Sequence, residues 1–364
     1  MTATHTFAPL PHEAPTVSVI VPARNEEVSL RTCLDSLIAQ KNVAFEIIVV
    51  DDHSTDRTRT IASSFAKSEA QPAVRIVDAS PLPTGWTGKN NAVTAGAKEA
   101  RSPWLLFTDA DTIHLPGSLA RSIEEAKRHN AALLSYSPQQ IVKAFCEKSV
   151  MPVIFAELAA TFRPAQVSNP NSPAAAANGQ YILITREAYD AVGGHAAIAE
   201  NLLEDVALAR AVKRSGKKIF FRYAADAVRT RMYRTFAELR EGWTKNLVLL
   251  FPYPAQLAVL RALEFLLIVA SLTIAIATAL RGHQKPALAS VTLFIILYAL
   301  FLKRIRAAHF DWDANLLSLF GLPLFSYLLL RSARAHATGS INWKGRQYPH
   351  ESSQTAYGAL PTNH

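Results

Sequence analysis

The sequence has very little cysteine, and the two that it has do not suggest cross-links or zinc. Cys33 and Cys146 lie far apart and without CxxC spacing. This pattern excludes a disulfide framework and a zinc-finger site, and it is typical of reduced thiols in a cytosolic protein. Residues 1–16 also lack an apolar core and a cleavage-site pattern. We therefore expect no secretory signal, and a soluble part that stays on the side of the membrane where it is made.

Basic runs with interleaved aromatic residues are absent from the N-terminal two thirds of the chain, although the formal net charge is +9. Their absence argues against nucleic acid as a partner. Anionic lipid headgroups and a nucleotide diphosphate explain the positive charge more simply.

Long apolar runs are missing before about residue 246 and frequent after it. Residues 262–280 contain Glu264 as their only charge, and residues 287–302 and 314–330 contain none. A membrane-spanning helix needs roughly 20 apolar residues, so each run can span once its flanks are included. Three such runs in succession, separated by short basic loops, make buried core helices of a soluble domain the weaker interpretation.

These runs divide the chain into three parts. We predict a catalytic domain over residues 1–245, a membrane region over 246–335 with about three transmembrane helices, and a polar tail over 336–364. The basic loop 303–306 gives a slight preference for a cytoplasmic catalytic domain on a multi-pass protein of the cell membrane.

An interfacial segment is predicted just before the apolar runs. Leu247–Leu260 is apolar but interrupted by Pro252 and Pro254. We expect it to lie at the membrane surface, with aromatic side chains at headgroup depth. These are Trp243, Phe251 and Tyr253.

The N-terminal part has the pattern of a mostly parallel α/β sheet. Short β-branched runs, typical of buried strands, alternate with stretches of helical composition, as in βαβ units. The predicted strands are 17–21, 46–50, 74–77 and 104–108, and the predicted helices are 26–40 and 91–100.

Polar clusters, each with at least one acidic side chain, follow three of these strands. They are Asn25-Glu26, Asp51-Asp52 and Asp109-Ala-Asp111. Ligands of such sheets bind at the carboxyl ends of the strands, so these clusters should meet at one edge. Carboxylates gathered there repel one another unless a cation joins them, and a hard divalent ion held with substrate phosphates would do so. Each cluster alone could equally be a turn or a helix cap.

The combined motifs resemble the family 2 inverting glycosyltransferases of GT-A fold. The resemblance covers residues 16–245 and rests on short segments that are weak alone and specific together. They are VSVIVPARNE at 17–26, EIIVVDDHSTD at 46–56, GKNNA at 88–92, LLFTDADT at 105–112, NGQY at 178–181, VGGH at 192–195, and Glu204-Asp205 followed by ALARAVKRSGKK at 207–218.

The resemblance implies a nucleotide-sugar donor. It puts Asp52 at the base of the nucleotide and Glu26 at the nucleoside. A carboxylate accepts a hydrogen bond from the imide N–H of uracil, which favours UDP as the leaving group. His53 stands where the family usually has glycine, so the local turn is expected to differ.

The resemblance also implies a metal cofactor, Mg²⁺ or Mn²⁺. Asp111 would bind the ion and Asp109 would contact the ribose or the ion, both lying on one side of an extended segment. Lys89 corresponds to a donor-site lysine that pairs with a phosphate; the alternative is a surface lysine at a helix start. Lewis-acid help of this kind contributes several kcal/mol to the transition state.

Asp205 is the candidate general base, and Glu204 a supporting residue. Inversion in one displacement needs a base that deprotonates the attacking hydroxyl, which typically contributes about 10²–10⁴-fold. Without the matching segment downstream, an acidic pair at this place would more often be a solvated helix cap.

On the acceptor side the match is less complete. Gly194, His195 and Trp243 are candidate acceptor-site residues, although Trp243 fits an interfacial anchor equally well. The QxxRW signature of many membrane members is missing, because Gly242 stands where arginine is expected. Diphosphate contacts would then come from one of three arginines, Arg231, Arg234 or Arg240.

Gly85–Asn90 (GWTGKN) and the three apolar runs resemble a narrower group, the hopanoid-associated and carotenoid-acid glycosyltransferases. That likeness implies a lipid acceptor, in particular a terpenoid, and residues 149–168 are either a wall of its cleft or an ordinary core helix. The alternatives are a processive polysaccharide synthase, a nucleotidyltransferase and a non-catalytic lipid-binding protein. The segment Trp343–Tyr348 is predicted to be ordered, with no role assigned.

Overall fold

The computed structural model of the protein describes residues 15–67 and 72–348. The expectations for residues 1–14 and for the end of the tail, 349–364, lie outside the described residues.

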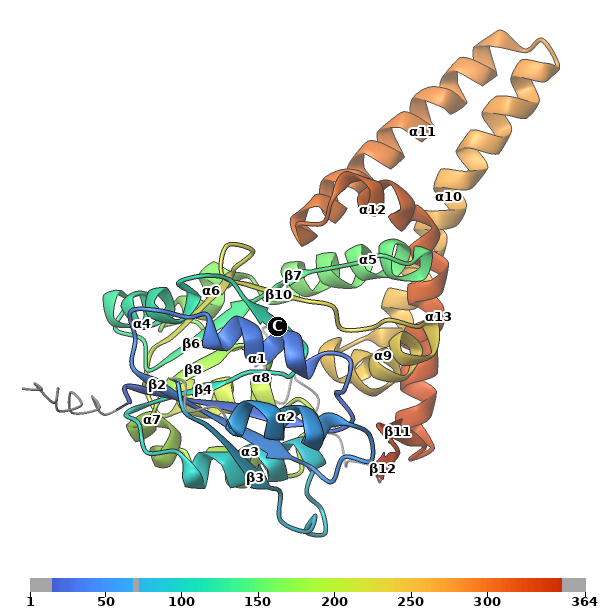
Figure 1. Ribbon diagram of the computed structural model, residues 1–364. Helices are drawn as coiled ribbons and strands as arrows, with labels where there is room; N and C mark the ends of the chain where they lie inside the picture. Colours follow the sequence, from blue (N-terminus) through green and yellow to red (C-terminus); the bar gives the residue numbers. More distant parts are fainter. Residues whose placement is uncertain (1–14, 68–71, 349–364) are drawn as a thin grey trace, which may run out of the picture.

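A seven-stranded sheet, ordered β3-β2-β1-β4-β8-β6-β9, lies at the centre of the N-terminal part (Figure 1). The first four strands in this order run parallel, and β8 is antiparallel to both of its neighbours. All four predicted strands are present, which confirms the α/β class. The bounds are β1 (Val17–Ala23), β2 (Phe45–Asp51), β3 (Val74–Asp78), β4 (Trp104–Phe107), β6 (Leu133–Ser137), β8 (Ile182–Thr185) and β9 (Ile219–Tyr223).

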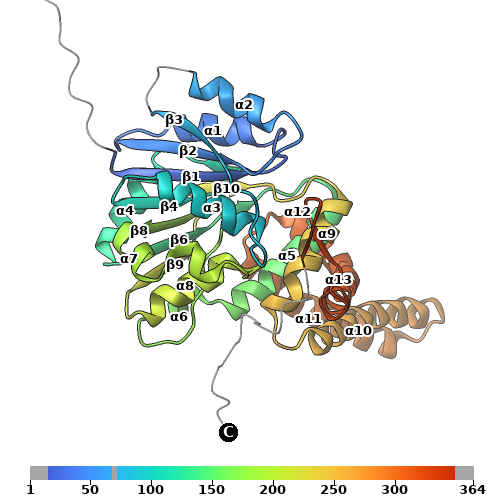
Figure 2. The ribbon, with the colours of Figure 1, turned by 90° about the horizontal axis from the view of Figure 1, so that it is seen from below.

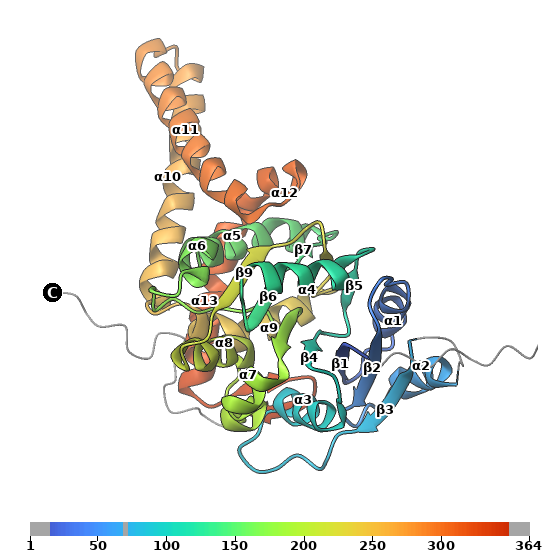
Figure 3. The same cartoon turned by 90° about the vertical axis from the view of Figure 1, so that its left-hand side faces the viewer.

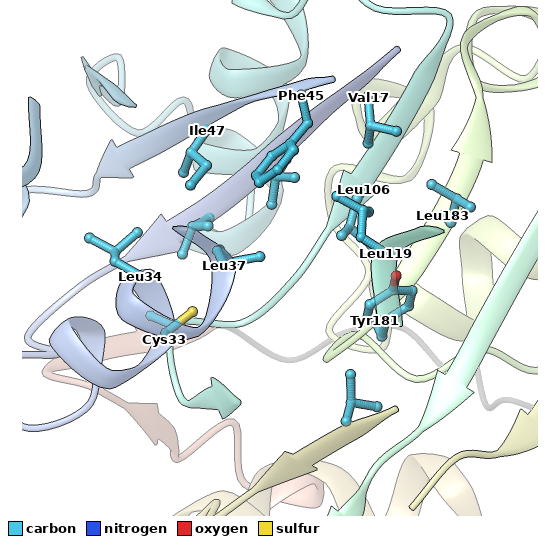
Figure 4. Close-up of a cluster of buried hydrophobic side chains, with 14 of the residues drawn as sticks. Val17, Cys33, Leu34, Leu37, Phe45, Ile47, Leu106, Leu119, Tyr181 and Leu183 are labelled. Atoms are coloured by element: carbon cyan, nitrogen blue, oxygen red, sulfur yellow. The ribbon is translucent and has the colours of Figure 1, made fainter. Parts of the chain in front are cut away.

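Helices cover both faces of this sheet and bury its apolar side chains (Figure 2). One face carries α1 (Leu30–Ile38), α2 (Thr58–Ala66) and α4 (Ser118–Arg128). The other carries α3 (Gly88–Glu99), α6 (Pro164–Ser168), α7 (Arg186–Ala191) and α8 (Glu204–Arg214). On the first face, Leu34 and Leu37 of α1 lie beside Ile47 of β2, and Leu119 lies beside Tyr181 (Figure 4).

A second, three-stranded sheet leads from this core toward the C-terminal helices. Its strands, in the order β5-β10-β7, are β5 (Thr112–His114), β10 (Val228–Thr230) and β7 (Gln139–Gln140). The long helix α5 (Phe145–Thr161) follows β7, and α9 (Phe236–Leu250) follows β10. Both helices pack in a third apolar core with the C-terminal helices.

Three C-terminal helical segments are long and apolar enough to cross a membrane: Pro254–Leu280, Gln284–Ala308 and Trp312–Ala337. The first two, built on α10 (Pro254–Leu280) and α11 (Gln284–Ile305), project from the rest of the protein as an antiparallel pair (Figures 1 and 3). Only 17% and 11% of their apolar windows are buried, whereas 44% of the third is. The third segment therefore also packs on the protein itself.

That third segment consists of three successive pieces. After the short turn η2 (Arg306–Ala308), it comprises α12 (Trp312–Leu317), η3 (Ser318–Phe320) and α13 (Gly321–Ala337). α13 runs along the side of the protein toward a final hairpin, β11 (Ile341–Trp343) and β12 (Arg346–Tyr348) (Figure 1).

A cluster of four charged side chains lies at the base of the projecting pair. Arg261 of α10 is 2.9 Å from Glu157 of α5 and 2.7 Å from Glu264. Arg304 of α11 pairs with the same two carboxylates, and its Nη2 lies 2.7 Å from Glu264 Oε2. The single charge in the first apolar run is thus neutralised, and α5 is joined to both helices.

The predicted interfacial aromatic residues are placed differently from one another. Trp243 and Phe251 are 2% and 3% exposed and belong to the core between α5, α9 and α13, so the headgroup position expected for them is wrong. Tyr253, at the turn between α9 and α10, is 66% exposed. Pro254 begins α10 there, because proline is tolerated at the first position of a helix.

Gly96 sets how closely α3 approaches the central sheet. A Cβ at this position would lie 2.6 Å from Ile20 Cγ2 and 2.8 Å from Val50 Cγ2. We predict that Gly96→Ala lowers the free energy of unfolding by about 1–3 kcal/mol, because both neighbours are β-branched and stiff. Thermal unfolding in detergent measures this, with Lys98→Ala on the exposed side of the same helix as the control. Equal stability of the two variants would contradict the close packing.

Candidate functional site

A cavity of about 870 Å³ opens at the carboxyl ends of β1, β2 and β4. All six carboxylates predicted from the sequence line it, although they come from four separate segments of the chain. They are Glu26, Asp52, Asp109, Asp111, Glu204 and Asp205. The expected convergence of acidic residues at one edge of the sheet is therefore present.

Two left-handed residues shape the rim of this cavity. Asn25 after β1 has φ 53° and His53 after β2 has φ 57°. Asn25 Oδ1 accepts a hydrogen bond of 2.9 Å from the backbone N–H of Thr55, which joins the two loops. His53 thus takes up a backbone conformation that glycine would adopt more easily, so replacing the usual glycine does not abolish the turn.

Lys89 lies between two of the acidic groups. Its Nζ is 2.7 Å from Asp109 Oδ1 and 2.7 Å from Glu204 Oε1. Burial opposes the charge of this ammonium, but the two carboxylates raise its pKa well above the usual value. Lys89 is therefore a fixed cation that joins the end of β4 to the start of α8.

The start of α3, which carries Lys89, is held by the neighbouring turn η1 (Gly194–Ile198). Asn90 Nδ2 donates to the carbonyls of Ile198, Ala199 and Asn201 at 2.9, 3.0 and 3.1 Å. The Thr87 side chain caps the helix by accepting from the Asn90 N–H. Lys89 does lie at a helix start, as the alternative supposed, but its ammonium is directed into the cavity by its two ion pairs.

Gly179 occupies the point where Lys89, Glu204 and Asp205 meet. A Cβ there would lie 2.8 Å from Lys89 Nζ, 3.2 Å from Glu204 Oε1 and 3.6 Å from Asp205 Oδ2. Its backbone N–H donates to Asp205 Oδ2 at 2.9 Å, and Val206 N–H donates to Asp205 Oδ1 at 2.7 Å. The Asp205 carboxylate is therefore held in one orientation, and any side chain at position 179 would disturb it.

The two adjacent carboxylates of α8 differ in acidity. Burial and the neighbouring Glu204 raise the pKa of Asp205 to about 6. Burial also acts on Glu204, but the charges of Lys89 and Lys245 outweigh it and hold the pKa of Glu204 below its usual value. Such a difference suits one permanently ionised carboxylate and one that can exchange a proton near neutral pH.

Asp109 and Asp111 lie in a turn and not on the extended segment that alternation suggested, because Thr112 N–H bonds back to the Asp109 carbonyl at 3.1 Å. Burial, Asp109 and Glu26 raise the pKa of Asp111 to about 7, and its Oδ1 is buried without a hydrogen-bond partner. An unpartnered carboxylate oxygen among like charges fits a divalent cation.

Protein ligands alone would not complete such a metal site. Within residues 15–67 and 72–348, no three histidine, cysteine or acidic side chains are grouped closely enough to hold an ion. Mg²⁺ characteristically takes one or two carboxylates and completes its shell with phosphate oxygens and water. Asp109 and Asp111 fit this requirement when a diphosphate is present.

Four further cations line the cavity that the sequence did not single out, namely Arg24, Lys245, Lys344 and Arg346. Lys344 pairs with Glu26, Arg346 pairs with Asp52, and Lys245 of α9 has its Nζ 5.2 Å from the centre of the Trp343 ring. Burial lowers the pKa of Lys245, and Glu204 partly opposes this effect. The sequence offered one indication of such cations, which is that the predicted ordered segment 343–348 contains two basic residues.

Two of the acceptor-site candidates lie away from the cavity. Gly194 and His195 do not line it; His195 is 2% exposed, and its Nδ1 is 3.1 Å from the Tyr189 hydroxyl. Burial lowers the pKa of His195 to about 4. A Cβ on Gly194 would lie 2.5 Å from the Tyr189 ring. The acceptor role predicted for both is wrong, and they support η1, which in turn holds α3.

Trp243 does line the cavity, with its indole N–H directed to Met151 Sδ at 3.3 Å. Of the three arginines proposed for the diphosphate, Arg231 and Arg234 line the cavity and Arg240 does not. Arg231 is already paired with Glu147, at 2.8 Å.

The other end of the cavity is apolar and lies toward the projecting helices. α5 contributes one side, and β9 and η2 contribute another. The apolar lining includes Phe155, Leu158, Ala159, Phe162, Phe221, Ala307 and Ala308. Residues 149–168 thus contribute to the cavity wall, and α5 also buries Val150 and Ile154 in the core.

Known proteins with similar sequences share one activity in their names. Residues 18–193 match the family model described as glycosyl transferase family 2. The chain is 28% identical over 346 residues to the 4,4'-diaponeurosporenoate glycosyltransferase of Staphylococcus aureus (strain MRSA252), covering 91% of this chain and 88% of that protein. The protein of the same name from strain USA300 is equally similar.

Among solved structures, the fold is similar to that of the mannosyltransferase PcManGT from Pyrobaculum calidifontis in complex with GDP-Man and Mn2+. The TM-score is 0.51 at 18% sequence identity, over 90% of this chain and 88% of that one. This likeness supports the GT-A assignment of the α/β domain.

Proposed function

We propose that this glycosyltransferase, whose residues 18–193 match the model of glycosyl transferase family 2, transfers a sugar from a UDP-sugar to a lipid acceptor at the cytoplasmic face of the cell membrane. The observation that carries this proposal is a single cavity with two chemically different ends. One end gathers the six carboxylates and their cations, and the other is walled by apolar residues of α5 and η2 beside the projecting helices. A polar donor and an apolar acceptor can meet between these ends.

The donor end suits a nucleoside diphosphate. Asp52 and Glu26 lie at the rim formed by β1 and β2, where a carboxylate can accept the imide N–H of uracil. Lys89, fixed between Asp109 and Glu204, offers an ammonium for a phosphate. Asp109 and Asp111 would hold Mg²⁺ or Mn²⁺ together with the diphosphate, and the bound ion would neutralise charge on the leaving group.

Asp205 is the proposed general base of an inverting displacement. The acceptor oxygen attacks the anomeric carbon, its proton passes to Asp205, and the bond from that carbon to the phosphate oxygen breaks with its electron pair leaving on UDP. Hydrogen bonds from Gly179 and Val206 fix the carboxylate for this transfer, and its pKa of about 6 leaves it ionised at neutral pH. Glu204 supports it by holding Lys89.

A lipid acceptor is supported by where the apolar end lies. His309, directly after η2, stacks on Tyr223 of β9 with ring centroids 4.3 Å apart, so the foot of α11 is in contact with the cavity wall. A terpenoid chain could enter between α5 and η2 without leaving the membrane surface. The relative named for 4,4'-diaponeurosporenoate is a precedent for such an acceptor.

The direct test of the proposed reaction is mass spectrometry of membrane lipids from cells with and without the protein, supplied with labelled UDP-sugars. A glycolipid that carries one labelled sugar and depends on the protein is the expected product. A long labelled polysaccharide would instead indicate a processive synthase, and absence of any labelled product would contradict the proposal.

Replacing Asp205 separates the base from donor binding. We predict that Asp205→Asn binds UDP nearly as tightly as the wild type and loses about 10²–10⁴-fold in turnover. Wild-type turnover should fall tenfold per pH unit below about pH 6, because protonation removes the base, and this dependence should vanish in the variant. Asp190→Asn, exposed on α7, is the control. Nearly normal turnover of Asp205→Asn would overturn the role of Asp205 as general base. That result is expected if the acceptor reacts through an ionised carboxylate, which has no proton to remove.

The metal prediction concerns Asp111. Isothermal titration of the wild-type protein should give tighter UDP binding with Mn²⁺ than without it, because the ion joins the diphosphate to Asp109 and Asp111. We predict that Asp111→Ala removes this difference, whereas Asp35→Ala on the exposed side of α1 preserves it. Equal wild-type affinity with and without Mn²⁺ would show that the metal assignment is wrong.

A larger side chain in the apolar part of the cavity tests whether the acceptor binds there. Ala159 of α5 lines the apolar part of the cavity and is half-buried. We predict that Ala159→Trp reduces the amount of labelled glycolipid about tenfold or more, since about 1.4 kcal/mol of lost acceptor binding corresponds to a factor of ten. UDP affinity should stay unchanged. An unaltered glycolipid level would locate the acceptor elsewhere.

A further inference from the structure

The hairpin β11–β12 brings a remote part of the chain to the donor end of the cavity. It follows α13 directly, and its turn residues Lys344 and Gly345 have φ values of 47° and 74°. Positive φ at both central residues is the geometry of a tight two-residue turn between antiparallel strands. The strands pair Trp343 with Arg346, so the turn presents Lys344 and Arg346 at the tip.

Both tip cations contact the carboxylates assigned to the nucleoside. Arg346 binds Asp52 through both guanidinium nitrogens, with Nη2 2.9 Å from Asp52 Oδ1. Lys344 pairs with Glu26 and also donates to the Arg24 carbonyl at 3.1 Å. Arg346 lies so close to the start of α3 that a Cβ on Gly88 would be 1.7 Å from its Nη1. A side chain at position 88 would therefore displace the Arg346 guanidinium from this place.

The position of the hairpin is fixed by more than these ion pairs. Ile341 is 1% exposed and packs with Leu202 and Leu249. The backbone N–H of Lys344 donates to Glu241 Oε1 of α9 at 3.1 Å. Trp343 packs against the core of the C-terminal helices. The base of the hairpin is therefore part of the fold.

Charge favours a hairpin that stays in place when the donor binds. Without Lys344 and Arg346, an anionic nucleotide would meet Glu26 and Asp52 as two further unpaired negative charges. If the hairpin instead blocked the site and moved away when the nucleotide bound, Lys344 and Arg346 would leave with it. The site would then lose two positive charges just as it received a negatively charged ligand. The hairpin does not fill the site either, since its residues line the same 870 Å³ cavity as Asp109 and Asp205.

We propose that the hairpin β11–β12 is the outer wall of the nucleotide site, and that Arg346 and Lys344 are positioning residues that orient Asp52 and Glu26 toward the base. This inference rests on the proposed UDP-sugar donor. It extends the donor site beyond the residues that match the family model, which end at 193.

The test is isothermal titration of the full-length protein with UDP and Mn²⁺. Arg346→Ala and Lys344→Ala should each weaken UDP binding about tenfold or more, as expected for losing a charge-assisted contact. Arg346→Lys should weaken it as well, because an ammonium cannot bind both oxygens of Asp52. Gln347→Ala, on the same strand with an exposed side chain, is the matched control and should bind UDP as the wild type does.

Hydrogen exchange of residues 341–348 provides a second measurement that does not depend on any variant. UDP should leave the exchange of the hairpin unchanged or slow it. Faster exchange with UDP, or tighter UDP binding by Arg346→Ala, would show that the hairpin competes with the nucleotide and would overturn the proposal, as would unchanged affinity of both alanine variants. Wild-type protein that binds no UDP would instead refute the proposed donor itself, and the inference with it.

Discussion

The site depends on one electrostatic constraint: the six carboxylates predicted from the sequence lie in one cavity and repel one another unless cations pair with them. Lys89 does this at the centre by pairing with Asp109 and Glu204. Lys344 and Arg346 do the same at the rim with Glu26 and Asp52. Asp111 has no such partner for its Oδ1, and burial, together with the charges of Asp109 and Glu26, raises its pKa to about 7. Four of the six carboxylates thus pair with the protein's own cations, and Asp205 is held by two backbone N–H groups. Asp111 keeps an unpartnered oxygen, which is where the proposed metal would bind.

Much of the fold and half of the site could be predicted from the sequence, because both follow from local patterns. The strands β1, β2 and β3 are short runs rich in valine and isoleucine, β4 is a short run of apolar residues, and parallel strands end at a common edge. Acidic residues placed directly after them therefore had to converge. The cations that pair with them could not be predicted in this way. Arg346 lies 294 residues from Asp52 and Lys344 lies 318 from Glu26, and no periodicity of the sequence relates segments so distant.

The wrong predictions share a physical cause, which is that burial in the core was not visible in a short motif. Gly194 and His195 match a family segment near the acceptor, yet Tyr189 and the turn η1 enclose them. Trp243 and Phe251 have the composition of a membrane interface, yet α5 and α13 cover both. In each case the residue type fits two environments. Only the packing of helices that are far apart in the sequence decides between them.

The same packing means that the α/β domain and the helices that are long and apolar enough to cross a membrane are built as one unit around α9 and α13. Ser332 of α13 donates to the Thr244 carbonyl at 2.7 Å and accepts from the Val248 N–H at 3.0 Å. Lys245, between these two residues, reaches into the cavity and contacts Trp343 of the hairpin. α13 therefore carries apolar residues at one end and leads into the hairpin β11–β12 at the other. A shift of α13 would move the hairpin and, through Lys344 and Arg346, the carboxylates of Glu26 and Asp52. If the proposed function is correct, the position of the C-terminal helices and the binding of the donor are therefore physically linked.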